Sequence, residues 1–398
     1  DELAVALANH APCDTDRISA LRFVAGARVG PGKTDGAEAG EWLGDLLKAV
    51  EAAKFTGPSP ARRTLIRRVA KSPREIATEL SKVYGHELKK VEYIPALALA
   101  GRVRLGTHTG EGTHRIDVER IVEPYVKGEQ PTTPTSGSGQ SGHLIFPVLA
   151  DVTEGGKRDR YVQLTRVAAD QMFDREGRML PSMPFHSEMS DALFMGGPIL
   201  AAAGRLTGER KYFDACVVHL KFMQKLVWRE DRIYRHSPLD ESAWGRGNGF
   251  PALGLTLSLS DFPADHPARG ELIEMVRAHL RALLKYQDAD GSWHQIIDRP
   301  ESYREFTCTA MITFSLRRGI DRGWLEESEF GPAAARGWEA VKRRIGDEGR
   351  LVDVCTGTGK MKSRREYYDR EAILGRDPRG GAMALLIATE MLSHGVRN

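Results

Sequence analysis

Apolar residues recur along most of this chain at the spacing of one helix face. They fall at positions i, i+3, i+4 and i+7 in Glu38–Lys54, Tyr161–Phe173, Tyr212–Val227, Pro267–Tyr286 and Pro332–Ile345. This spacing predicts amphipathic helices. Runs of alternating β-branched residues, which would indicate strands, are hard to find. The pattern therefore predicts an all-α protein.

A short acidic and glycine-rich motif recurs between these helices. Its copies contain Gly177, Asp231, Gly291 and Gly349, which follow one another after 54, 60 and 58 residues. A period long enough for two helices and two connections indicates stacked helical hairpins that bury their apolar faces against neighbours. We expect the hairpins to close into a ring, an (α/α)6 toroid, with an open solenoid as the alternative.

The domain organisation follows from this repeat. We expect a single catalytic domain over residues 1–398, in which residues 1–130 form an N-terminal extension and the first hairpins. The segment Pro131–Gly142 is rich in Pro, Ser, Thr and Gly and is predicted to be a loop inside the domain. Residues 143–398 would then form the remaining core.

Composition and charge exclude several classes of partner. Apolar residues make up 41% of the chain, which is enough for a large core. The net charge is only +3 and the basic residues recur at helical spacing, so we expect no nucleic-acid partner. No apolar run approaches the roughly 18 residues that span a bilayer, so we expect no membrane partner. The pattern gives no indication of an oligomeric state.

Two further features bear on compartment and metals. The chain begins at Asp1, so we expect a periplasmic or secreted protein if a signal peptide preceded it, with the cytoplasm as the alternative. The four cysteines form no C-x-x-C pair, and Cys216 and Cys308 are expected to be buried thiols. Asp288-x-Asp290-Gly291 begins like a calcium loop, but Arg299 stands where a glutamate ligand is needed. We therefore expect a turn capped by Asp side chains, and no metal.

Asp191 is the best candidate for an acid. It begins a strongly apolar helix, where a carboxylate can cap free backbone N–H groups. Its neighbours His186, Glu188 and Met195, however, form a mixed polar and apolar patch suited to a proton donor. Helix cap and catalytic acid are the two interpretations.

A second group of candidates follows about one repeat later. After His236 the chain reads Trp244-Gly-Arg246-Gly-Asn248-Gly, and the glycines let the backbone come close to a ligand. A Trp face can stack on a sugar, an Arg fork can bind a carboxylate, and Asn can bind hydroxyls. A helix boundary at Asn248 is the alternative. Trp293 and His294 are further candidates, although a core tryptophan explains Trp293 equally well.

These blocks resemble a known family. Asp191–Met195, Ala203–Gly208, Tyr234–His236, Trp244–Gly249 and Tyr286–His294 are similar to the unsaturated glucuronyl and rhamnogalacturonyl hydrolases, glycoside hydrolase families 88 and 105. The resemblance runs from about residue 140 to the C-terminus and is closer to family 105. It implies an (α/α)6 barrel without a metal or cofactor. The implied substrate is an oligosaccharide that ends in a 4,5-unsaturated uronic acid.

The resemblance also implies a mechanism. Asp191 would protonate C4 of the double bond and then help water to add at C5, after which the hemiketal opens and releases the neighbouring sugar. His236, Trp244, Arg246 and Asn248 would line the sugar subsite, with His236 or Arg246 holding the substrate carboxylate. The apolar residues after Asp191 would favour its protonated form.

One departure concerns a second acid. Where many family members carry another aspartate, this chain offers Gln140 and His143, which we expect to contact the substrate instead. Glu188 is the nearest replacement carboxylate. A related toroid glycosidase or lyase acting on a saturated uronide is therefore an alternative, with Glu188, Asp240 or Glu241 as the second carboxylate. A non-catalytic carbohydrate-binding protein is the other alternative.

Overall fold

The computed structural model of this chain describes residues 60–185 and 188–395. These residues belong to two compact units. In the smaller unit, residues 60–71 and 342–346, α4 (Pro60–Ala70) lies beside the C-terminal end of α17 (Glu327–Arg343). There the Lys342 ammonium donates to the Val69 carbonyl at 2.6 Å and the Arg68 guanidinium to the Arg343 carbonyl at 3.3 Å. The larger unit contains residues 72–341 and the described residues from 347 onward.

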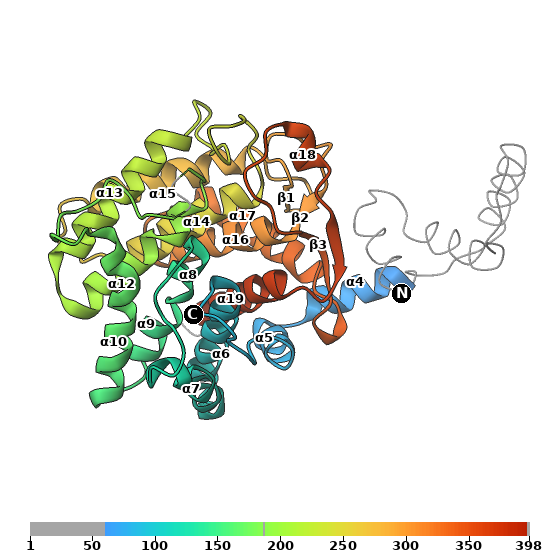
Figure 1. Cartoon of the computed structure of the whole chain (residues 1–398). Coiled ribbons are helices and arrows are strands. Elements are labelled where there is room, and N and C mark those ends of the chain that lie inside the picture. The colour runs from blue at the N-terminus through green and yellow to red at the C-terminus, as the bar shows by residue number, and fades with distance from the viewer. Residues whose placement is uncertain (1–59, 186–187, 396–398) are drawn as a thin grey trace, which may run out of the picture. The chain divides into compact units, whose positions relative to one another are not determined.

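Helices of the larger unit alternate between an inner and an outer layer along the chain (Figure 1). The inner helices are α6 (Tyr93–Thr109), α8 (Gly137–Gly142) with α9 (Ile145–Ala150), α11 (Ala192–Met195) with α12 (Gly197–Thr207), α14 (Arg246–Asp261), α16 (Phe306–Asp321) and α19 (Pro378–Gly395). The outer helices are α5 (Pro73–Ser81), α7 (Gly112–Val126), α10 (Gly155–Ala169), α13 (Arg210–Val227), α15 (Arg269–Leu284) and α17 (Glu327–Arg343).

The inner helices form a closed ring. Each packs against the next in chain order, and α19 packs against α6 to complete the circle. The outer helix α5 packs against α19, so one hairpin is formed by helices from opposite ends of the larger unit. Because no inner face is left without a neighbour, the ring excludes the open solenoid. The prediction of an all-α toroid is confirmed.

The helices predicted from periodicity are present with small shifts at their ends. Tyr212–Val227 corresponds to α13 and Pro267–Tyr286 to α15. Pro332–Ile345 overlaps α17, which begins earlier, at Glu327, and ends at Arg343. Tyr161–Phe173 covers most of α10 and the following 3-10 turn η1 (Asp170–Met172). The remaining predicted helix, Glu38–Lys54, lies outside the described residues.

The predicted loop over residues 131–142 is wrong in its second half. Residues Gly137–Gly142 form the short inner helix α8, which begins after Ser136. The Ser136 hydroxyl accepts the Gly139 N–H at 3.0 Å and so caps the helix. Gly142 is needed for packing, since a Cβ there would lie 2.5 Å from the Glu92 nitrogen. Small residues that resemble a linker in sequence here permit close helix packing.

Short antiparallel strand pairs lie in the connections from outer to inner helices. Among the described residues, β1 (Trp293–His294) pairs with β2 (Arg304–Glu305), and Trp293 lies opposite Glu305. β3 (Leu351–Cys355) pairs with β4 (Ala372–Gly375), with Val354 opposite Ile373. The short helix α18 (Arg364–Tyr368) lies between β3 and β4. These connections supply most of the site described below.

The recurring motif forms turns at the start of these connections. Gly177, Gly291 and Gly349 adopt left-handed backbone angles, with φ of 76°, 93° and 70°. In the copy that contains Asp231, Arg232 adopts this conformation, with φ of 67°. Each copy joins an outer helix to the next inner one, so the chain returns to the same end of the ring every time.

The Asp288 copy is a capped turn, as predicted. A carboxylate oxygen of Asp288 accepts the Asp290 N–H at 3.0 Å, and one of Asp290 accepts the Ser292 N–H at 2.8 Å. Arg304 pairs with Asp288 at 3.1 Å. The acidic side chains of this loop therefore bind backbone and arginine. Cys216 and Cys308 are both buried free thiols, as expected.

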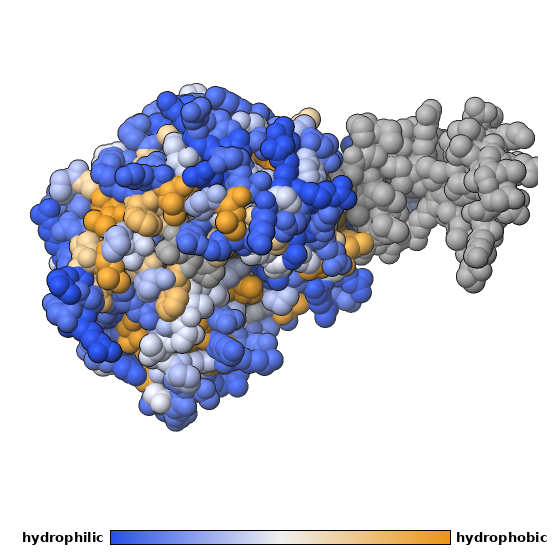
Figure 2. All heavy atoms as spheres, turned by 45° about the horizontal axis from the view of Figure 1, so that its top comes forward, coloured by the Kyte–Doolittle hydropathy of each residue, from blue (hydrophilic) through white to orange (hydrophobic). Residues whose placement is uncertain are grey.

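The surface and the helix lengths bear on membrane contact. Hydrophilic residues cover much of the face shown in Figure 2, with smaller apolar patches between them. Across residues 60–185 and 188–395, no helix combines the length and the apolar character needed to cross a bilayer.

Candidate active site

Polar residues meet where the inner helices begin. Tyr93 is the first residue of α6 and Arg246 the first of α14, while Asp191 directly precedes α11. Arg246 interacts electrostatically with both Tyr93 and Asp191. Helix N-termini carry partial positive charge from their free N–H groups. Six inner segments that begin at one end of the ring therefore favour an acidic ligand there.

Asp191 is buried and does not cap its helix. Its side chain accepts no capping hydrogen bond, and its own φ and ψ, −53° and −30°, are already helical. The cap interpretation is therefore wrong. The preceding turn is held by Ser190, whose N–H donates to the His236 carbonyl at 2.8 Å and whose hydroxyl donates to the Gly247 carbonyl at 2.6 Å. The residue is 5% exposed, and its Oδ1 has no hydrogen-bond partner within the described chain.

His236 lies between Asp191 and a tyrosine. Its Nε2 is 3.3 Å from Oδ1 of Asp191, and its Nδ1 is 2.9 Å from the hydroxyl of Tyr367. The first pair is close enough for electrostatic attraction but is not aligned as a hydrogen bond. The imidazole is fully buried. The tyrosine belongs to α18, which the periodicity did not predict.

Several buried polar atoms around this pair have no hydrogen-bond partner within the described chain. They are Oδ1 of Asp191, Nε2 of His236, Nε1 of Trp244 and the hydroxyl of Tyr303. Trp244 shares an apolar cluster with Cys355 and Tyr367, and Tyr303 packs against it. Buried polar atoms in folded proteins are nearly always bonded. A cluster of unbonded ones indicates a place where a polar ligand or water binds.

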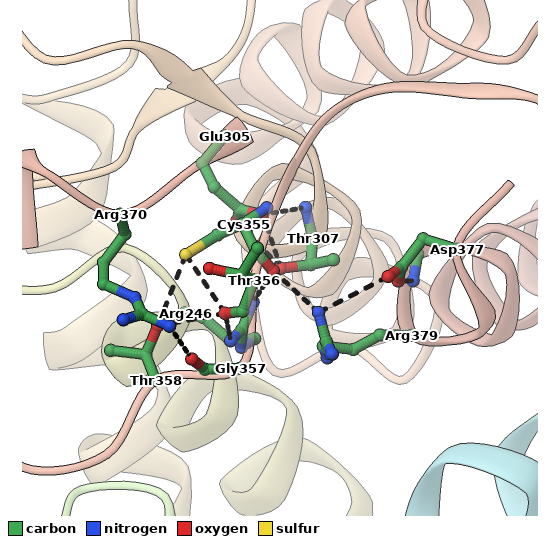
Figure 3. Close-up of polar contacts among 11 residues, drawn as sticks. Arg246, Glu305, Thr307, Cys355, Thr356, Gly357, Thr358, Arg370, Asp377 and Arg379 are labelled. Atoms are coloured by element: carbon green, nitrogen blue, oxygen red, sulfur yellow. Dashed lines mark hydrogen bonds and ion pairs between the residues drawn. The ribbon is translucent and has the colours of Figure 1, made fainter. Parts of the chain in front are cut away.

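Arg246 is committed to the backbone of the loop after β3 (Figure 3). Its guanidinium donates to the carbonyls of Cys355 at 2.8 Å and Thr356 at 2.7 Å. It also lies 4.5 Å from the centre of the Trp244 ring, a cation–π contact. Arg379 donates to the same Cys355 carbonyl at 3.0 Å. Arg246 thus shapes one wall of the site, and its contact with a substrate carboxylate stays a prediction.

Glu305 anchors the same wall and was not singled out from the sequence. Its carboxylate accepts the N–H groups of Thr307 at 3.0 Å, Cys308 at 2.6 Å and Cys355 at 3.0 Å, and also the Thr307 hydroxyl (Figure 3). It therefore caps α16 and fixes the end of β3. The sequence shows an acidic residue directly before a helix, which could have indicated a helix cap. The hydrogen bond from Cys355 to Glu305 depends on the tertiary structure and could not be predicted from the sequence. Since its oxygens are occupied, Glu305 is a structural carboxylate.

The glycines of the Trp244–Gly249 block serve packing. A Cβ at Gly245 would lie 2.5 Å from the His294 carbonyl oxygen, and one at Gly247 would lie 3.1 Å from the Ser190 hydroxyl. We expected these glycines to admit a ligand. Instead they let α14 approach the neighbouring loops, and this places His236, Trp244 and Arg246 beside Asp191.

Two expected sugar contacts are engaged with the protein. The Trp244 ring is 1% exposed, and its centre lies 4.5 Å from that of His236. The Asn248 side chain donates to the carbonyls of Tyr234 and Trp244 and accepts the Tyr234 N–H at 2.8 Å. The amide therefore holds the loop that carries His236. Sugar contacts of Trp244 and Asn248 stay predictions.

Trp293 and His294 are also bonded internally. Trp293 is fully buried and its indole N–H donates to the Leu283 carbonyl at 2.8 Å, which fits the alternative of a core tryptophan. The two ring nitrogens of His294 lie 2.6 Å from the Ser302 carbonyl and 3.0 Å from Asp288. Both residues support the β1–β2 connection.

Gln140 and His143 lie on and just after α8, which packs against α11. Gln140 is buried and donates to Gln171 at 3.0 Å, while its own side-chain oxygen has no partner within the described chain. Nδ1 of His143 lies 2.8 Å from the Gly139 carbonyl, and burial lowers the pKa of this imidazole to about 4. Whether either touches substrate stays a prediction. His186 lies outside the described residues.

Comparisons with known proteins bear on the class of this site. The ring is shared with a family 105 glycoside hydrolase from C. acetobutylicum ATCC 824 (TM-score 0.69, 19% identity, 81% of this chain and 100% of that one). The family model for Glycosyl Hydrolase Family 88 matches residues 66–394. The protein is thus an (α/α)6 toroid of the glycoside hydrolase type. The chain belongs to Glycosyl Hydrolase Family 88, which confirms the resemblance.

Two named relatives each match about half of this chain. An unsaturated 3S-rhamnoglycuronyl hydrolase of Alteromonas sp. (strain LOR) is 27% identical over 215 residues, which cover 51% of this chain and 50% of that protein. The unsaturated rhamnogalacturonyl hydrolase YesR of Bacillus subtilis (strain 168) is 29% identical over 189 residues, 45% of this chain and 52% of that protein. The chain spans about half the length of the curated relatives it matches.

Proposed function

We propose that this protein removes a 4,5-unsaturated uronic acid from the non-reducing end of an oligosaccharide, with Asp191 as acid and then base. The observation that carries the proposal is the position of Asp191. It is a buried carboxylate with one unbonded oxygen, 3.3 Å from a histidine, at the positive ends of the inner helices. The family and the named activities of the two relatives support the substrate class.

The chemistry suits a single carboxyl group. Asp191 gives its proton to C4 of the enol ether, and the positive charge that develops at C5 is stabilised by the new carboxylate. The carboxylate then takes a proton from water as the water oxygen bonds to C5. The resulting hemiketal opens and releases the neighbouring sugar. A buried acid with few bonds suits this cycle because it exchanges its proton without breaking a structural contact.

The rival hydrolysis of a saturated uronide needs two carboxyl groups on either side of the scissile bond. The three candidates for the second one are engaged elsewhere. Glu188 is exposed and paired with Lys360, Glu241 is exposed and paired with Arg235, and Asp240 accepts the Ser242 N–H at 2.8 Å. This arrangement supports the single-acid reaction.

Loss of the ultraviolet absorbance of the conjugated double bond tests the proposal. Lyase-generated oligosaccharides from several uronic-acid polysaccharides are the substrates. We expect wild type to remove the absorbance, and Asp191→Asn to do so about 10²- to 10⁴-fold more slowly, as for loss of a general acid. Glu188→Gln is the matched control and should retain activity. Cleavage of a saturated uronide with unchanged absorbance on every unsaturated substrate would establish the rival. Sugar binding without turnover would establish the non-catalytic alternative.

A further inference from the structure

Tyr367 contacts His236 from α18, a short helix that the hydrophobic periodicity of the sequence did not predict. Its hydroxyl is 2.9 Å from Nδ1 of His236 and also accepts the Met361 N–H at 3.3 Å. Tyr367 is buried, and burial is the main reason that the pKa of its phenol is raised. The phenol therefore keeps its proton at neutral pH.

Hydrogen-bond accounting fixes where that proton points. A phenol has one proton to donate, while the backbone N–H of Met361 can only donate. Within the described chain, Nδ1 of His236 is the one acceptor within reach of the Tyr367 hydroxyl. A buried O–H without an acceptor would be costly. The hydroxyl therefore donates to Nδ1.

The direction of this bond sets the tautomer of His236. A neutral imidazole carries one proton, so an Nδ1 that accepts leaves the proton on Nε2. Nε2 is the atom that faces Oδ1 of Asp191 at 3.3 Å. We propose that Tyr367 is a positioning residue that keeps the proton of His236 on Nε2, the ring nitrogen 3.3 Å from Oδ1 of Asp191, where its partial positive charge stabilises the carboxylate formed when Asp191 gives up its proton. The inference rests on the proposed role of Asp191.

Other groups around the pair do not replace this donor. Among the described residues, the titratable and charged side chains that interact electrostatically with Asp191 or Tyr367 include Tyr93 on α6, Arg246 on α14, and Asp240 and Glu366 near Tyr367. Arg246 donates to the carbonyls of Cys355 and Thr356. Oδ1 of Asp191 accepts no hydrogen bond within the described chain, so Tyr93 does not donate to it. Nε2 of His236 is thus the nitrogen that the structure places against the carboxylate.

Tyr367→Phe tests the inference, with Tyr368→Phe as its matched control. The control residue lies on the same short helix, but its hydroxyl donates to the exposed Glu301 at 2.5 Å. We expect kcat on an unsaturated disaccharide to fall about tenfold in Tyr367→Phe while KM changes less than about threefold. The alkaline limb of the pH–rate profile should move to higher pH, because the ionised form of Asp191 loses support. Tyr368→Phe should match wild type in all three respects.

Nitrogen-15 NMR of histidine-labelled full-length protein gives a readout that does not depend on turnover. The His236 signal is assigned by its loss in His236→Gln. Wild type should show a proton on Nε2 and none on Nδ1, and Tyr367→Phe should show a mixture of tautomers. A proton on Nδ1 in wild type would overturn the inference. So would a lower kcat in Tyr367→Phe with an unmoved alkaline limb, since that is the effect of a structural residue. Absence of wild-type turnover on unsaturated substrates would instead defeat the proposed function.

Discussion

Replacement of Arg246 by alanine separates a structural role from a substrate-binding role. The guanidinium is 2% exposed and donates to the Cys355 and Thr356 carbonyls. Each hydrogen bond from a charged donor contributes about 1.5–3 kcal/mol, and the buried cation–π contact with Trp244 about 1 kcal/mol. Both carbonyls keep other partners: Arg379 donates to that of Cys355, and Thr358 and the Cys355 thiol to that of Thr356. These contributions sum to about 4–7 kcal/mol, and because both carbonyls stay bonded we expect the free energy of unfolding to fall by about 3–5 kcal/mol.

Urea unfolding followed by circular dichroism measures this loss of stability. Binding of acidic and neutral oligosaccharides to the folded variant measures the role of Arg246 in the site. The structure predicts equal damage to both ligands, because the loop that forms the wall is displaced. A direct contact between Arg246 and the substrate carboxylate would instead damage binding of acidic sugars more than of neutral ones. Arg365→Ala is the control: its pair with Asp369 is exposed and screened by solvent, so the free energy of unfolding should hardly change. Unchanged stability with loss of acidic ligands alone would refute the structural role.

Two further predictions concern the pH dependence of stability. Burial raises the pKa of Glu390, but Arg318 and Arg104 outweigh it and hold the pKa far below its usual range. Glu390 therefore contributes its full share of the folding stability above about pH 4.5, the pKa of the group in the unfolded chain. This stabilisation is lost at lower pH. Glu390→Gln should cost about 3–5 kcal/mol at pH 7 in urea unfolding, because two partly buried arginines lose their buried partner. A loss below about 1 kcal/mol would contradict this. Burial also lowers the pKa of three histidines to about 4: His143, His219 and His279. As the pH is lowered, the unfolded chain takes up these protons before the folded protein does. The urea midpoint should therefore decrease as the pH is lowered from about 6.5 to about 4, and His219→Asn should make this decrease less steep. An equally steep fall in the variant would show that His219 does not contribute.

Much of the architecture could be predicted from local pattern. Helical periodicity located α13 and α15 within a few residues, because the buried face of an amphipathic helix requires apolar residues at every third or fourth position. The recurring acidic and glycine-rich motif indicated hairpins of fixed length. The error at Gly137–Gly142 has a physical cause: small residues permit either a flexible loop or a tightly packed helix, and only the neighbouring segment around Glu92 decides between them.

The site was predictable only in part. Asp191, His236, Trp244 and Arg246 were chosen from the sequence, and the structure brings them together. Sequence alone did not show that Asn248 and Arg246 bind backbone, nor that Tyr367 bonds to His236 across 131 positions of the chain. Such contacts depend on which loops meet at the end of the ring.

The sequence by itself determined that this chain is helical, that its hairpins repeat, and that an acid and a cluster of sugar-binding residue types follow one another within one and a half repeats. These properties are local, since they depend on spacing and residue chemistry. The tertiary structure decided which polar groups are occupied and which remain free beside Asp191. Closure of the ring decides which of these groups are bonded, because it brings the loops of distant repeats together around Asp191.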